Sequence, residues 1–358
     1  MNILLKNLRK CSITDLNLQI QGKDGNMSTL FDVWNTIQKQ LFPSFEQELD
    51  PLTEKERKFI QIVTLLDLPS HMKAYRWRGF GRRRKSRLAM AKAFVAKSVY
   101  NLETTDMLII NLKSCKNIRR LCGWELPGQV PSSPTFSRAF NEFSVGELPQ
   151  KIHEAMIKKH CGEKLAGHIS RDSTAIESRE KPVKKPKASP KPKRKRGRPR
   201  KGEVAAAKPR KRVEVQVERS LRENINDLPT VCNVGTKKNS KGYKTTWIGY
   251  KLHVDCIDGD IPISTILTSA SLHDSQAAIP LAQMSCQRVT NLYDLMDAAY
   301  DSPEIHAFSN SLGHRPIIDN NPRRGEKILM DPATKSRFAE RSSAERVNSY
   351  LKDNYGGR

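Results

Sequence analysis

The sequence has no uninterrupted apolar run near the ~18 residues that a membrane-spanning helix requires. A secretory signal is also missing, because only Ile3, Leu4 and Leu5 precede the return of charged residues. The seven cysteines are scattered and never spaced C-x2-C, which argues against a disulfide framework and against a zinc ribbon. We therefore expect a cytoplasmic protein with reduced cysteines.

Acidic residues are scarce relative to basic ones, with 38 Asp or Glu against 63 Lys or Arg and a net charge of +25. A surplus of this size indicates a polyanionic partner. Nucleic acid is favoured over a membrane surface, because no basic amphipathic helix with a strong apolar face accompanies the charge.

Much of the charge lies in one segment, Lys181 to Arg212, which has sixteen Lys or Arg against one acid, Glu203. The surrounding residues 181–215 contain almost no large apolar side chains, so we predict a disordered insert. Within it, one run resembles an AT-hook, an extended segment that places arginines in the minor groove of double-stranded DNA. A solvated linker is the alternative. The residues of the run that we expect to bind DNA are Arg196, Gly197, Arg198, Pro199 and Arg200.

Residues 1–150 are predicted to form an all-helical, DNA-binding domain. Apolar residues recur at spacings of three and four in five segments: Ser28–Leu41, Thr53–Leu66, Ser86–Asn101, Thr105–Cys122 and Thr135–Phe143.

Inside this region, His71 to Arg87 holds eight basic residues and no acid, with Tyr75, Trp77 and Phe80 interleaved. Such a mixture suits phosphate contacts and stacking on bases, and we expect DNA contact at Arg82, Arg83 and Arg84. The alternative is a solvated turn whose aromatic residues belong to the core.

Residues 151–358 are predicted to form an α/β domain with a mixed sheet. Gly259 and Asp260 predict a hairpin turn that makes the second and third strands antiparallel neighbours. The expected strands are Leu165–Glu177, Thr245–Cys256, Ile261–Ser269, Asn291–Met296 and Pro316–Ile318, and the expected helices are Ser275–Val289, Ser302–Leu312 and Arg337–Tyr355.

Three acids in this domain are candidates for catalysis: Asp172 in the first strand, Asp297 after the fourth, and Glu345 on the closing helix. A carboxylate at the end of an apolar strand is costly unless a cation accompanies it. Three such carboxylates could hold two Mg²⁺ ions about 4 Å apart. The simpler alternative is a surface helix with an Arg341–Glu345 ion pair.

The order of these motifs resembles the DDE-type insertion-sequence transposases, whose catalytic core is RNase H-like. Their signature Tyr-x2-Arg-x3-Glu-x6-Lys is matched by Phe338, Arg341, Glu345 and Lys352, with Phe in place of Tyr. Further matches are Asp172-Ser-Thr, Gly249–His253, Ala270–Asp274, Asp297-Ala-Ala-Tyr300-Asp301, Leu121–Gly123 and Pro131–Arg138.

The resemblance implies a polynucleotidyl transferase in which Asp172, Asp297 and Glu345 hold two Mg²⁺ ions, with Mn²⁺ able to substitute. An activated water would cleave at the transposon's terminal inverted repeats, and the freed 3′-hydroxyl would attack target DNA. Arg341 and Lys352 would hold phosphates. It also implies an oligomer on DNA in a bacterial nucleoid.

Two alternatives remain open at this point. A truncated or domesticated protein could occupy transposon ends without catalysis, since only Asp353 to Arg358 follow Lys352. A nuclease with the same core could cut without joining. We do not expect His253 and His273 to be metal ligands, because histidines at strand ends are more often structural.

Overall fold

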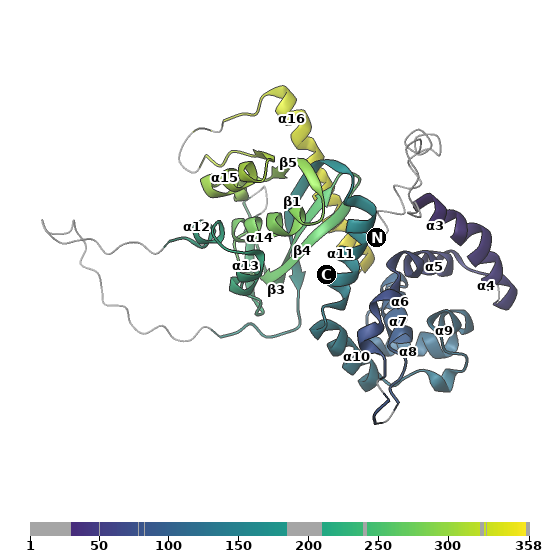
Figure 1. Ribbon diagram of the computed structural model, residues 1–358. Coiled ribbons are helices and arrows are strands. Elements are labelled where there is room, and N and C mark those ends of the chain that lie inside the picture. Colours follow the sequence, from purple (N-terminus) through teal and green to yellow (C-terminus); the bar gives the residue numbers. More distant parts are fainter. Residues whose placement is uncertain are drawn as a thin grey trace, which may run out of the picture. The chain divides into compact units, whose positions relative to one another are not determined.

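The computed structural model describes residues 30–49, 51–77, 79–81, 83–184, 210–238, 242–322, 326 and 328–355. They divide into two compact units (Figure 1). A helical unit comprises the described chain through Leu165, Arg288–Thr290 and the chain from Ser349 onward, and an α/β unit comprises Ala166–Gln287 and Asn291–Asn348. None of the helices in these described ranges is long and apolar enough to cross a membrane.

The helical unit confirms the expected all-helical region. Two details differ from the prediction: the helix expected over Thr105–Cys122 breaks at Cys115, whose backbone is extended, and the boundary expected at residue 150 lies inside a further helix. Its elements are α3 (Leu30–Thr36), the π-helical η1 (Ile37–Leu41), α4 (Phe42–Glu48), α5 (Glu54–Leu66), α6 (Leu68–His71), η2 (Lys73–Tyr75), α7 (Arg87–Val99), α8 (Thr105–Ser114), α9 (Lys116–Cys122), η3 (Pro127–Gln129), α10 (Ser133–Val145) and α11 (Leu148–Cys161).

Side-chain caps explain where several of these helices begin. Thr53 and Glu56 form a reciprocal capping box at the start of α5, and the hydroxyl of Ser86 accepts from the backbone N–H of Ala89 at the start of α7. The apolar faces that follow meet in one core, whose members include Phe59, Met90, Leu108, Phe136 and Ile152. Burial of these faces, more than helix propensity, stabilises helices of this length.

The α/β unit contains a six-stranded sheet of order β2-β3-β1-β5-β6, with β4 also paired to β3. Its strands are β1 (Leu165–Glu177), β2 (Asn233–Lys238), β3 (Lys244–Ile257), β4 (Ile261–Ser269), β5 (Thr290–Met296) and β6 (Arg315–Ile318). Its helices are α12 (Arg212–Gln216), α13 (Leu221–Asp227), α14 (Ser275–Cys286), η4 (Ala298–Tyr300), α15 (Pro303–Ser311), α16 (Pro332–Phe338), η5 (Ala339–Arg341) and the first half of α17 (Ser342–Tyr355), which from Ser349 onward belongs to the helical unit.

The mixed sheet confirms the predicted fold class. β1 and β4 have the predicted bounds, β3 and β4 are antiparallel, and β5 and β6 are parallel. The predicted hairpin turn is present, with positive φ angles at Gly259 (+84°) and Asp260 (+62°).

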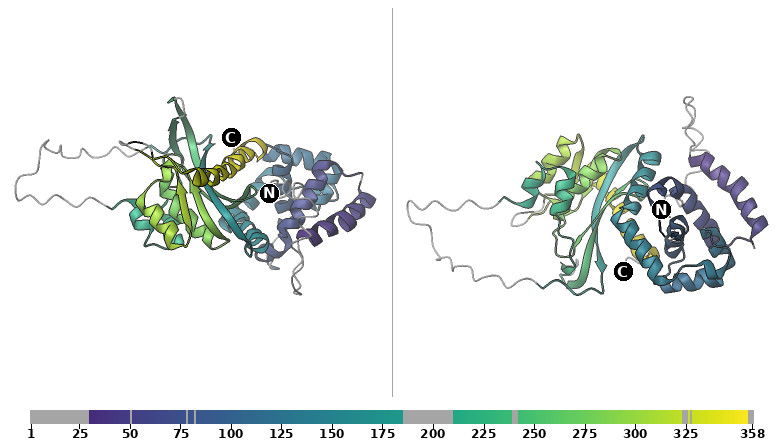
Figure 2. Two further views of the ribbon diagram at one scale, coloured as in Figure 1. Left: turned by 90° about the horizontal axis from the view of Figure 1, so that it is seen from above. Right: turned by 60° about the horizontal axis from the view of Figure 1, so that its bottom comes forward.

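Different helices cover the two faces of the sheet (Figure 2). Residues of a strand alternate between faces, so Arg171 and Asp172 of β1 point in opposite directions. Arg171 reaches Asp255, which also accepts from Ser285 of α14, whereas Asp172 accepts a hydrogen bond from Asn348 of α17. The first half of α17 therefore lies on the same face as Asp172.

The insert predicted over residues 181–215 is described only at its ends, Lys181–Lys184 and from Arg210 onward. The prediction of disorder is wrong for the last residues of the insert, because α12 begins at Arg212 and Val213 is buried among residues of α14 and α15. The guanidinium of Arg212 donates to Asp227 (2.8 Å) and Gln276 (2.7 Å). These contacts anchor the chain where it returns to the sheet.

Candidate active site

Asp172 and Asp297 lie on neighbouring strands of the sheet. Asp172 is within β1, and Asp297 directly follows β5, where its Oδ1 accepts from the backbone N–H of Ala299 (2.9 Å) and caps η4. Burial raises the pKa of both carboxyl groups, and at Asp172 the charge of Asp297 raises the pKa further. The fold therefore brings two of the three predicted acids into electrostatic contact.

The third predicted acid, Glu345, lies on α17 and forms an ion pair with Arg341. Its side chain is 55% exposed, against 20% for Arg341. The positive charge of Arg341 acts to lower the pKa of both Asp172 and Asp297. The charge of Arg341 therefore acts on all three acids, through an ion pair with Glu345 and through its effect on the pKa of the two aspartates. Within the described ranges, no three His, Cys, Asp or Glu side chains are grouped so that they could hold a metal ion.

The helix predicted over Arg337–Tyr355 is not continuous. Phe338 ends α16, Arg341 lies in the 3-10 turn η5, and α17 begins only at Ser342. The residues at the two junctions, Phe338 and Ser342, keep right-handed helical backbone angles, and the Arg341–Glu345 pair expected from helical spacing still forms. The ring of Phe338 lies 5.7 Å from the guanidinium carbon of Arg341 and supports it through a cation–π contact.

α17 is fastened to the sheet near the aspartates. The side-chain amide of Asn348 donates to Asp172 (3.0 Å), and Arg346 and Ser343 both donate to Asp260 in the β3–β4 turn. Ala344 and Val347 are buried, so this side of α17 packs inward. Asn348 was not singled out from the sequence, because its contact with Asp172 joins residues 176 positions apart.

Further polar residues interact electrostatically with the pair of aspartates, and no role was assigned to them from the sequence. Burial acts to raise the pKa of Asp274, but Lys251, whose ammonium lies 2.8 Å from the carboxylate, holds this pKa below its ordinary value. Asp274 in turn acts to raise the pKa of Asp297. The phenol of Tyr300 is fully buried, and its pKa is raised first by burial and then by Asp274, Asp172 and Asp297.

Lys237 on β2 adds a cation to this environment and acts to lower the pKa of both Asp172 and Asp297. The strand that carries it was not predicted. The signals that could have drawn attention to Asp274 and Tyr300 are their places in the motifs Ala270–Asp274 and Asp297–Asp301.

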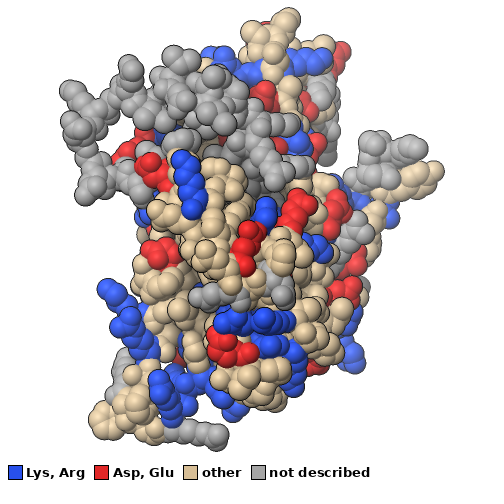
Figure 3. Space-filling view, turned by 90° about the vertical axis from the view of Figure 1, so that its right-hand side faces the viewer, with Lys and Arg blue, Asp and Glu red and all other residues tan. Residues whose placement is uncertain are grey.

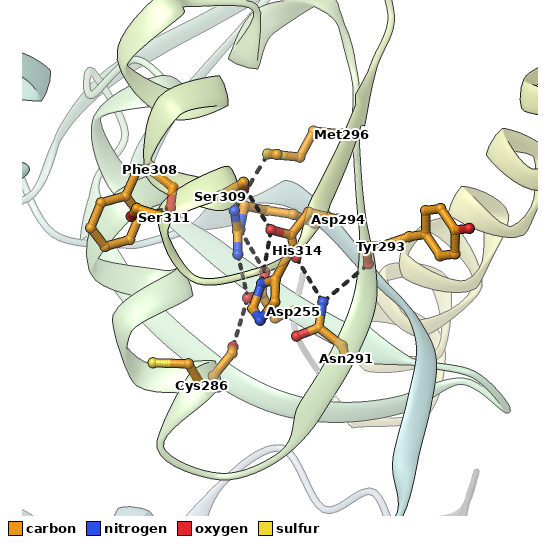
Figure 4. Close-up of polar contacts among 12 residues, drawn as sticks. Asp255, Cys286, Asn291, Tyr293, Asp294, Met296, Phe308, Ser309, Ser311 and His314 are labelled. Carbon is orange, nitrogen blue, oxygen red and sulfur yellow. Dashed lines mark hydrogen bonds and ion pairs between the residues drawn. The ribbon is translucent and has the colours of Figure 1, made fainter.

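The opposite face of the sheet holds a buried polar network that supports the strands (Figure 4). Arg171 and Asp255 are cross-strand neighbours and form a buried bidentate ion pair with N–O distances of 2.8 and 2.7 Å. Asp294 of β5 accepts hydrogen bonds from Ser309 of α15 and from Asn291, and contacts His314. The network fixes the strands whose other face carries Asp172 and Asp297.

The remaining predicted DNA-binding residues lie elsewhere. Lys352 is half-buried on the part of α17 that belongs to the helical unit. Arg83 and Arg84 are exposed before α7, and Arg84 forms an ion pair with Glu142 (3.0 Å). Arg82 and the run Arg196–Arg200 lie outside the described residues.

In the sheet, β1 lies between β3, to which it is antiparallel, and β5. This order, with acids on β1 and after β5, is that of an RNase H-like fold. The chain belongs to a family of transposases. A family model described as "Transposase DDE domain" matches residues 168–358, and one described as "Transposase domain (DUF772)" matches residues 47–142. No curated protein and no solved structure matches the chain.

Family membership assigns the chain to the DNA transposases, a class of polynucleotidyl transferases that act on DNA and generally use divalent metal ions.

Proposed function

We propose that this transposase cleaves the terminal inverted repeats of its transposon and joins the freed 3′-hydroxyl to target DNA. The observation that carries the proposal is the pair of aspartates on neighbouring strands, whose pKa values are raised by burial. Asp297 also acts on Asp172 through its charge. Two carboxylates held in this way favour a divalent cation, because a cation offsets both their burial and their repulsion.

The donor chemistry fits Mg²⁺, with Mn²⁺ as a substitute, since the ligands on offer are carboxylate oxygens. Asp172 and Asp297 would hold the metal, and Glu345 would join them on exchanging its ion pair with Arg341. When bound, two such ions activate the attacking oxygen and stabilise the departing one.

The chain's own residues position the DNA for two displacements at phosphorus. In cleavage, a water oxygen bonds to phosphorus and the strand's 3′ oxygen leaves and takes up a proton. In joining, that 3′-hydroxyl loses its proton as it bonds to a target phosphorus, and the target's 3′ oxygen leaves. Arg341 and Lys237 would hold phosphates beside these reacting groups, and Lys352 would contact phosphates elsewhere along the DNA. Two ends must be processed together, so we infer an oligomer on DNA.

The experiment measures Mg²⁺-dependent cleavage of duplexes that carry the transposon's own ends. Asp172→Asn, Asp297→Asn and Glu345→Gln keep the side-chain shape and should each reduce cleavage by at least about a thousandfold. Glu340→Gln is the matched control, because this exposed acid in η5 lies close in sequence to Glu345. Undiminished cleavage by any of the three variants contradicts the proposed site.

The structure also motivates a second candidate, a protein that occupies transposon ends without cutting, because Glu345 is paired with Arg341 and no three-acid group is present among the described residues. Binding of end duplexes without cleavage in Mg²⁺ or Mn²⁺ would favour it. Cleavage without any joined product would instead favour a nuclease.

A further inference from the structure

The described part of residues 76–85 in the helical unit presents an aromatic side chain to solvent; we name it the aromatic turn. The indole N–H of Trp77 donates to the carbonyl of Phe80 (3.0 Å) and closes the turn. Gly79 (φ +92°) and Gly81 (φ +73°) flank Phe80 in left-handed conformations that other residues rarely adopt. Phe80 is 91% exposed, more than any other large apolar residue in the described part of the chain.

The base of the aromatic turn is fixed to α10. Arg84 and Arg87 both donate to the carboxylate of Glu142, at 3.0 and 2.8 Å. Just before the turn, Tyr75 packs edge-to-face on Phe143 with ring centroids 5.2 Å apart. The exposed Phe80 therefore projects from a fixed base. Because that base is already ordered, binding through Phe80 costs little further conformational entropy.

The charge around Phe80 restricts what can cover it. Arg76, Arg83 and Lys85 are all exposed, and no acid occurs between His71 and Arg87. An apolar protein surface would have to desolvate these cations, whereas DNA offers phosphates for the cations and stacked bases for the ring. In the space-filling view, Lys and Arg side chains gather at the lower end of the face that corresponds to the right-hand side of Figure 1 (Figure 3).

We propose that Phe80 is a wedge that inserts between base pairs of double-stranded DNA and kinks it, while the neighbouring cations contact phosphates on both sides. Apolar wedges of this kind unstack a base step and widen the contact between protein and DNA. The inference rests on the proposed function, because it requires that the chain bind duplex DNA. It adds a DNA-deforming residue in the helical unit, separate from the carboxylates of the α/β unit.

The test uses the full chain and a mixed-sequence duplex of about 30 base pairs with a fluorescent donor and acceptor at its two ends. Phe80→Ala should weaken binding by roughly tenfold and abolish the bend seen by energy transfer, while the dependence of affinity on salt stays unchanged. Phe80→Leu should keep most of both effects, since leucine also acts as a wedge. Ile110→Ala on α8 is the control: this residue is 64% exposed in the same unit and should change neither quantity.

Lys85→Ala should lower the slope of log affinity against log salt by about one, the value for one phosphate contact, and should leave the bend in place. Unchanged affinity and bend in Phe80→Ala would overturn the wedge alone. So would a change in the oligomeric state of the DNA-free chain with unaltered DNA binding, which would make a second copy the partner. Failure of the wild-type chain to bind any duplex would overturn the proposed function as well.

Discussion

Acidification should weaken the α/β unit through His253, a fully buried imidazole on β3. Its Nε2 lies 2.9 Å from the hydroxyl of Thr268, and its backbone is opposite Ser173 on β1. Burial lowers the pKa of His253 from 6.5 to about 4, with Lys251 and Arg171 acting in the same direction and Asp274 against them. The folded unit therefore keeps this imidazole neutral where an exposed histidine would be protonated.

The sign and size of the effect follow from these two pKa values. Between pH 6.5 and about 4 the unfolded chain binds a proton at His253 more readily than the folded chain does, so stability falls as the pH falls through this window. At 1.36 kcal/mol for each pH unit between the two values, the full loss is about 3 kcal/mol, and about 2 kcal/mol of it occurs by pH 5.

The assay is urea-induced unfolding at pH 7 and pH 5, followed by hydrogen exchange in peptides that cover β3. The wild-type chain should lose about 2 kcal/mol more than His253→Gln between these two values. His273→Gln is the control, since His273 is exposed and its Nδ1 lies 2.8 Å from the hydroxyl of its near neighbour Ser275. Equal pH dependence in the wild type and His253→Gln would refute the reasoning.

Three further predictions concern the scaffold, the site and the insert. Arg171→Met leaves Asp255 buried without its cation and should lower the free energy of unfolding by roughly 3–5 kcal/mol in urea titrations, with partial recovery on adding Asp255→Leu. Lys237→Ala should slow cleavage of end duplexes by roughly tenfold without changing stability, whereas Lys244→Ala should not; equal rates would exclude the proposed phosphate contact. Deleting residues 185–209, which contain eleven Lys or Arg, should flatten the plot of log affinity against log salt; an unchanged slope would identify a spacer.

The strands of the sheet were largely predictable, because their residues form uninterrupted β patterns bounded by clear turn signals. Leu165–Glu177 and Ile261–Ser269 were predicted with the observed bounds. β2 was not, since Asn233–Lys238 contains Gly235 and two lysines and gains its order by pairing with β3. Gly235 is required there because a Cβ would lie 2.4 Å from the ring of Trp247, a contact between strands that local sequence does not reveal.

The candidate site was predictable only in part for a similar reason. Strand position placed Asp172 and Asp297 near each other, since Asp172 lies within β1 and Asp297 directly follows the neighbouring strand β5. The Arg341–Glu345 pair followed from helical spacing and is present. The contact of Asn348 with Asp172 depends on how α17 packs against the sheet, and the position of Lys237 depends on the pairing of β2 with β3; local sequence reveals neither.

Charge balance connects the metal and the DNA in the proposed function. Asp172 and Asp297 are acted on by Arg341 and Lys237, and Glu345 is paired with Arg341. The cations that offset the acids in the protein alone are therefore the ones proposed to hold phosphates. Divalent ions at the carboxylates would neutralise the acids in place of Arg341 and Lys237. Arriving phosphates would then offer these two cations new partners. Metal and DNA should accordingly bind cooperatively, because each removes a charge penalty that the other creates.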